Sequence, residues 1–159
     1  MDLMSLIQTI EQSGIGRLVR ESVWLFAAIE SVHLIGLTMM GGAALLVDLR
    51  LLNLVMSDRP VAELAADAKR YFNIGLVARV ISGFALFASE AVKCYYSQPF
   101  WVKIITLFVA TIFSYGFRNR VALARDDSYS TGTKALAALG SIAMWFVVAA
   151  AGRWVGFSG

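Results

Sequence analysis

Glu30 and His33 stand three positions apart inside a long apolar segment, and His33 is the only histidine of the chain. Residues at this spacing lie close together on one face of a helix. A neutral imidazole can bind haem iron or another metal through one ring nitrogen while a nearby acid orients the other nitrogen. The pair therefore marks a candidate cofactor site, in which His33 is the metal ligand and Glu30 orients it.

Each of the other three long apolar segments carries an ionisable residue at a similar depth: Glu90, Lys103 and Arg153. Unpaired charge inside a membrane is costly, and ionisable residues there commonly mark binding sites or ion pathways. We expect these residues to gather around His33, where Lys103 and Arg153 would neutralise the propionates of a b-type haem. Asp48 and Arg79 form a second expected pair, closer to the opposite membrane surface.

Methionines supply further soft ligands. The second axial position of the iron could be open, could be filled by His33 of a second copy, or could be filled by Met39, Met40 or Met144. The same methionines with His33 would form a copper site, because thioethers and imidazole suit Cu(I). Methionines that only fill a helix interface would produce the same pattern.

Two other functions would use the same charges. In a proton- or ion-coupled transporter or channel subunit, the path would be lined by Glu30, His33, Glu90, Lys103 and Arg153. In a structural or accessory subunit of a membrane complex, these residues would only fix how the helices pack. The chain contains no Ser-His-Asp triad, phosphate loop, zinc-ligand spacing or nucleotide fingerprint, so whether it is an enzyme stays open.

Composition predicts what must position these residues. The chain has 159 residues, of which 58% are hydrophobic, which is typical of a multi-pass membrane protein. We expect one all-α membrane domain over 1–159, a four-helix bundle with spans at approximately 22–47, 72–95, 100–117 and 134–157. The first of these spans would cover roughly 38 Å, enough to cross a hydrocarbon core of about 30 Å. The single cysteine, Cys94, excludes a disulfide within the chain.

The remaining segments predict orientation and partners. Residues 1–20 are expected to form an amphipathic helix on the membrane surface, and Asp58 to cap the second long helix with Pro60 in its first turn. Basic residues concentrate in the connections between the first and second spans and between the third and fourth, which places both termini in the periplasm of a bacterial inner membrane. Those basic clusters are interpreted as lipid-headgroup anchors, so no nucleic acid is expected. Glycine-rich faces favour a homo-oligomer, and electron transfer would require a periplasmic redox partner.

Four motifs together resemble a known family: E-x-x-H-x-x-G at 30–36, VDLRLLNL from Val47, FWVKI at 100–104 and AGRWVGF at 151–157. They are similar to an uncharacterised family of small bacterial four-helix inner-membrane proteins, with a looser similarity to the membrane domain of copper-resistance D-like proteins. The resemblance implies architecture and location. Membrane cytochromes with the same architecture place several histidines across their helices, whereas this chain has one, which excludes a bis-histidine haem within one protomer.

Overall fold

The computed structural model describes residues 3–125 and 128–156, and within these ranges all regular secondary structure is helical. Four helices are long and apolar enough to cross a membrane, which confirms the expected all-α membrane bundle. In chain order the elements are α1 (Leu3–Glu11), α2 (Gly14–Glu21), α3 (Val23–Leu51), α4 (Val61–Ser89), α5 (Ala91–Tyr96), α6 (Gln98–Phe113), the π-helix η1 (Ser114–Arg118), α7 (Asn119–Leu123) and α8 (Thr131–Val155).

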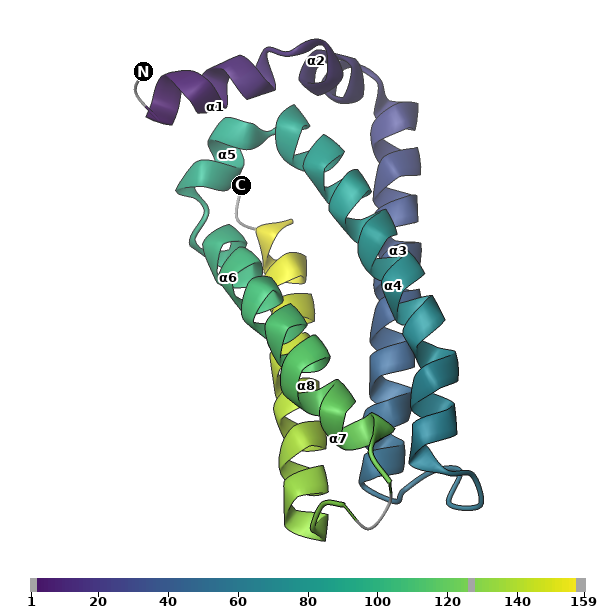
Figure 1. Ribbon diagram of the computed structural model, residues 1–159. Coiled ribbons are helices and arrows are strands. Elements are labelled where there is room, and N and C mark those ends of the chain that lie inside the picture. The colour runs from purple at the N-terminus through teal and green to yellow at the C-terminus, as the bar shows by residue number, and fades with distance from the viewer. Residues whose placement is uncertain (1–2, 126–127, 157–159) are drawn as a thin grey trace.

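The spans form two antiparallel pairs, α3 with α4 and α6 with α8 (Figure 1). At one end of the bundle lie the loops that follow α3 and α7, and we call it the loop end. At the other end lie α1, α2 and α5, and we call it the α1 end. The two pairs approach each other at the loop end and diverge towards the α1 end (Figure 1).

Two of the expected spans differ in length from the helices that contain them. The second span, expected at 72–95, belongs to a helix that runs from Val61 to Ser89, and Ala91–Tyr96 forms the separate helix α5. The third span continues past 117 to Leu123 through η1 and α7. The expected cap at Asp58 was wrong, because Asp58 lies in the turn two residues before the N-cap position. That position is occupied by Pro60, whose side chain makes no cap hydrogen bond.

The N-terminal segment forms two helices instead of one. Ser13 separates them, and its hydroxyl accepts a hydrogen bond from Gly16 N at 3.2 Å, which caps α2. A Cβ on Gly16 would lie 2.5 Å from Glu11 O and 2.6 Å from Ala88 O, so α2 approaches α4 too closely for a side chain. Helix α1 consequently extends across the α1 end of the bundle (Figure 1).

Glycines also set how closely α3 approaches α4. A Cβ on Gly75 would lie 2.6 Å from Gly36 O and 2.7 Å from Met40 N. Backbones this close require small residues at the contact, as is usual for helices that pack inside a membrane.

Tightly packed apolar residues fill the loop end and the middle of the bundle. The cluster at the loop end consists of Val47, Leu51, Val61, Ala65, Ala68, Val121, Ala122, Ala137 and Ala138. The middle cluster consists of Met40, Ala44, Phe72, Ala110, Trp145 and Val148. The Phe72 ring meets the Trp145 ring edge-on at a centroid distance of 5.7 Å. The α1 end is built differently, around a cavity described below.

A buried ion pair joins three helices near the loop end. Arg118 Nε lies 2.9 Å from Asp48 Oδ1, and the Ser141 hydroxyl donates to Asp48 Oδ2 at 2.6 Å. Arg118 Nη2 also donates to Ala44 O at 2.8 Å. The expected pairing of Asp48 with Arg79 was therefore wrong. Arg79 packs at the level of Gly36, which is about 18 Å along α3 from Asp48.

Candidate functional site

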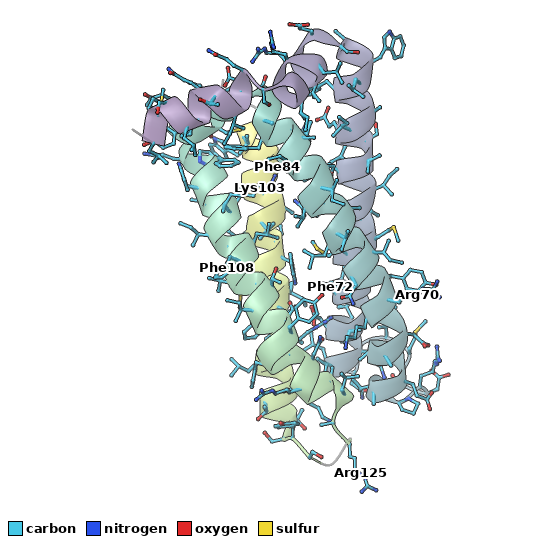
Figure 2. All side chains as sticks on the ribbon, turned by 45° about the horizontal axis from the view of Figure 1, so that its top comes forward. Arg70, Phe72, Phe84, Lys103, Phe108 and Arg125 are labelled. Carbon is cyan, nitrogen blue, oxygen red and sulfur yellow. The ribbon has the colours of Figure 1, made fainter. Side chains whose placement is uncertain are left out.

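A cavity of about 480 Å³ lies at the α1 end, where α4 and α6 diverge beneath α1. Figure 2 shows Lys103 and Phe84 in this region. Leucine, isoleucine and aromatic side chains form most of its wall, and α1 contributes Leu3, Leu6, Ile7 and Ile10. A concave, mostly apolar site with few polar groups is the usual form of a binding site for a small molecule or cofactor.

The basic side chains on the cavity wall are a histidine, an arginine and a lysine, and Tyr95 and Trp101 add a hydroxyl and an indole N–H. His33 comes from α3, Arg79 from α4 and Lys103 from α6, so three of the four spans contribute one basic group each. No carboxylate is found among the described residues that line the cavity. The wall is therefore apolar with one positively charged region.

The hydrogen bonds of His33 define which of its ring nitrogens is free. His33 Nδ1 lies 3.0 Å from Ser82 Oγ, and Ser82 Oγ lies 2.6 Å from Ala78 O. A carbonyl can only accept, so the single hydroxyl hydrogen of Ser82 goes to Ala78 O, and Ser82 Oγ accepts from Nδ1–H. The neutral ring then carries its lone pair on Nε2. That atom is buried and has no hydrogen-bond partner in the described part of the chain.

Gly83 leaves the space beside α4 that the His33 imidazole occupies. A Cβ on Gly83 would lie 3.1 Å from His33 Cε1, so the ring rests directly against the α4 backbone. Gly83 follows Arg79 by four residues, so the two share a face of α4. The sequence contained no sign that the glycine accommodates the histidine.

Arg79 is the most deeply buried of the three basic groups. Its side chain is only 4% exposed, and neither Nε nor Nη1 has a hydrogen-bond partner within residues 3–125 and 128–156. Burying a charge without a partner is costly, so buried arginines are ordinarily paired. Arg79 is therefore a candidate functional residue of the cavity, although the sequence pattern had suggested only a pairing with Asp48.

Lys103 reaches the cavity across the surface of α8. A Cβ on Gly152 would lie 3.6 Å from Lys103 Cε and 3.7 Å from its Cδ, so the apolar part of the lysine passes over this glycine. The Lys103 side chain is thereby held between α6 and α8. Of the five residues expected to form one cluster, His33 and Lys103 are the two that line the cavity.

The other three expected site residues lie elsewhere. Glu30 is exposed on α3, and the hydrogen bond expected between it and His33 is made by Ser82. Glu90 lies in the junction between α4 and α5, where its Oε2 is 3.9 Å from Lys93 Nζ. Arg153 is exposed near the end of α8. The spacing along the helices gave comparable depths for these charges, but the rotation of each helix directs them away from the cavity.

The methionines expected as additional ligands are also outside the cavity. Met40 is fully buried in the middle cluster, and Met144 packs against that cluster. Neither these two nor Met39 is among the described residues that line the cavity. Across the described ranges, no three His, Cys, Asp or Glu residues are arranged to hold a metal ion together. Any metal at this site would therefore depend on His33 and on ligands that the metal brings with it.

Glu11 fixes the end of α1 that lies nearest α4. Its Oε2 accepts from Val92 N at 2.7 Å, and its Oε1 is 3.3 Å from Arg20 Nη1. Arg20 Nη1 is also 3.4 Å from Ser89 O. These contacts attach the cover of the cavity to the junction between α4 and α5.

A sequence profile for a family of unknown function (DUF6644) matches residues 7–158. The matched range includes His33, Arg79 and Lys103, and it agrees with the expected resemblance to an uncharacterised family. No curated protein and no solved structure matches the chain. With nearly its whole length covered by the profile, the chain belongs to the DUF6644 family.

Proposed function

We propose that the protein is an integral membrane cofactor protein that binds a b-type haem through His33 and takes part in electron transfer. The observation that carries this proposal is His33, a residue that lines the cavity and whose Nε2 is buried without a partner among the described residues. Ser82 holds the opposite ring nitrogen, which is how histidine ligands of metals are usually oriented.

The size and lining of the cavity suit a large planar cofactor. Its volume of about 480 Å³ falls within the range of roughly 300–1,000 Å³ that is usual for small-molecule sites. Haem would supply one-electron chemistry at its iron. The chain's own residues would orient the imidazole through Ser82, exclude water through α1, and place Lys103 near the acidic edge of the cofactor.

The first test is an absorption spectrum of the detergent-purified protein, as isolated and after dithionite, with elemental analysis for iron and copper. We expect a Soret band that shifts on reduction, and its loss in His33→Ala. Thr38→Ala is a matched control, because Thr38 is exposed on the same helix and bonds only to Leu34 O at 3.0 Å. Full haem content in His33→Ala would overturn the proposal, as would a colourless protein from haem-replete cells.

The same measurement separates haem from copper. The similarity to copper-resistance D-like proteins motivates a Cu(I) site on His33, but Met39, Met40 and Met144 lie outside the cavity lining described above. If the purified protein contains one copper per chain and shows no Soret band, and if His33→Ala loses that copper, the bound cofactor is copper and not haem.

Orientation follows from the positive charges at the loop end. Its loops carry the concentration of basic residues, so the positive-inside rule places the loop end in the cytoplasm of a bacterial inner membrane. The α1 end, both termini and the cavity would then face the periplasm, where a redox partner would dock. Gly41 and Gly42 have open space beside them, which provides a face for a second copy of the chain.

Transport is the alternative from another class. A proton- or ion-coupled path would need the intramembrane charges, so flux in proteoliposomes that Glu30→Gln abolishes would support it over haem binding. If the protein is an accessory subunit, neutralising these charges would instead weaken assembly of the complex and would change no activity of the protein itself. The exposed positions of Glu30 and Arg153 give both alternatives less support than the cavity gives to a bound cofactor.

A further inference from the structure

Two arginines of this chain are buried to the same degree, and they differ in what surrounds them. Arg79 and Arg118 are each 4% exposed. Arg118 contacts the Asp48 carboxylate, Ala44 O and the Asn119 side chain. Arg79 leaves Nε and Nη1 without a partner in the described structure, and it borders a cavity. The unmet donors of Arg79 therefore point to a partner that the chain itself does not supply.

The chemistry of the guanidinium narrows that partner to an anion. Its planar array of N–H donors matches carboxylate and phosphate groups with two parallel hydrogen bonds. Lys103 adds a second positive charge on the same wall, and the described lining residues include no carboxylate to compensate it.

The rest of the wall requires that the ligand be largely apolar and come from the membrane. Val80, Phe84 and Ile104 are exposed apolar residues of α4 and α6 that line the cavity. Exposed apolar side chains of a spanning helix face lipid, so we infer that the cavity opens towards the bilayer between α4 and α6. Helix α1 covers it from the direction of the aqueous phase (Figure 1).

The depth of Arg79 favours a carboxylate over a phosphodiester. Arg79 lies ten residues before the end of α4 at Ser89, which is about 15 Å along the helix. A carboxylic acid can travel this distance in lipid as its neutral form and ionise beside Arg79. A phosphodiester stays charged near neutral pH and would bear the full cost of leaving the interface.

We propose that the cavity selects amphiphiles that carry a carboxylate, drawn laterally from the bilayer, and that Arg79 with Lys103 is the selecting pair. The inference shares its cavity with the proposed haem function and names the class of ligand, but it does not depend on metal binding at His33. Two sources of the same chemistry fit the cavity: the propionates of a porphyrin, and a long-chain fatty acid.

The test uses the full chain in lipid nanodiscs and metal-free protoporphyrin IX, whose fluorescence reports binding. We expect protoporphyrin IX to bind at least tenfold more tightly than its dimethyl ester, which has the same body and no carboxylate. Arg79→Gln and Lys103→Gln should each weaken binding of the acid and reduce this ratio. Arg70→Gln is the matched control, because Arg70 is on the same helix, is exposed and points away from the bundle (Figure 2).

Competition identifies the natural source. Displacement of the porphyrin by palmitate but not by hexadecanol supports a fatty acid, whereas no displacement by palmitate supports a porphyrin dicarboxylate. Equal affinity for the acid and its ester would overturn the proposal, as would an unchanged ratio in Arg79→Gln or displacement by phosphatidate alone. In His33→Ala the preference for the acid should persist. The proposed haem function can therefore fail while carboxylate selection stands, and the reverse also holds.

Discussion

At the scale of single residues, two equally buried guanidinium groups differ in whether the chain supplies partners for them. Arg118 satisfies Asp48 and fixes three helices, whereas Arg79 bears a cost of burial that nothing in the described structure offsets. Residues that lower the stability of the fold and make no compensating structural contacts are typical of functional sites.

This contrast predicts opposite effects on stability. Arg118→Met should lower the free energy of unfolding by about 3–5 kcal/mol, because it leaves Asp48 buried without its partner. Arg79→Met should leave the stability of the ligand-free protein unchanged or raise it, because it removes an unpaired buried charge. Thermal unfolding in detergent measures both. Equal destabilisation by the two substitutions would contradict the functional assignment of Arg79.

Cys94 provides a test outside the four spans. Burial raises the pKa of its thiol to about 11, with a smaller contribution from nearby Glu90. The thiolate is the reactive form, so at pH 7.5 the folded protein should react with maleimide far more slowly than the protein unfolded in SDS. The rate in the folded state should rise as the pH approaches 10. Rapid labelling of the folded protein at pH 7.5 would show that the thiol is not buried as described.

At the scale of elements, the contact between α3 and α4 depends on Gly36 and Gly75. Gly75→Ala should destabilise the protein by about 1–3 kcal/mol, because the added Cβ would meet Gly36 O at 2.6 Å, where backbone has to move. Gly41→Ala is the control: nothing lies within 4 Å of the added atom, and alanine favours the helix by up to about 1 kcal/mol. The measurement is the thermal unfolding of both variants under the same conditions. If Gly75→Ala is as stable as the original protein, α3 and α4 are farther apart than described.

The elements themselves were predicted better than their contacts. Four apolar runs sufficed for four spans, because length and hydropathy decide whether a helix crosses a membrane. The Arg118 partner of Asp48 and the unpaired state of Arg79 in the described structure were not predictable, because they depend on the depth that each helix reaches in its pair and on its rotation. His33 and Lys103, which residue type and depth along the spans placed in the expected site, both line the cavity. Ser82 and Gly83 were missed as parts of the site, since a serine and a glycine in a helix are common without any such role.

At the scale of the whole molecule, packing is uneven along the bundle axis. Two apolar clusters and a buried ion pair fill the loop end and the middle of the bundle, whereas the α1 end is built around a cavity that α1 covers. Regions with fewer buried contacts open more readily, and binding sites are commonly found in them.

Hydrogen–deuterium exchange should reveal this difference. We expect fast exchange in α1 and α5 and slow exchange in 44–51, 118–122 and 137–141, which carry the loop-end contacts. Glu11→Gln should accelerate exchange in α1 by weakening its contacts with Val92 N and Arg20, and leave α8 unchanged. Protection of α1 equal to that of 137–141 would show that the cover is as firmly packed as the core.

The wide turn of η1 has a consequence for how the third span should be aligned with its relatives. Ala110, Ser114 and Arg118 are all buried, although residues eight positions apart drift by about 80° around an ordinary α-helix. The π-helical hydrogen bonding of 114–118 accommodates one surplus residue and removes most of that drift. A relative that lacks one residue in this stretch and continues as an ordinary α-helix would still place its aligned arginine opposite the equivalent of Asp48. A one-residue insertion or deletion here therefore changes the number of residues in the span and leaves the phase of the helix face nearly unchanged.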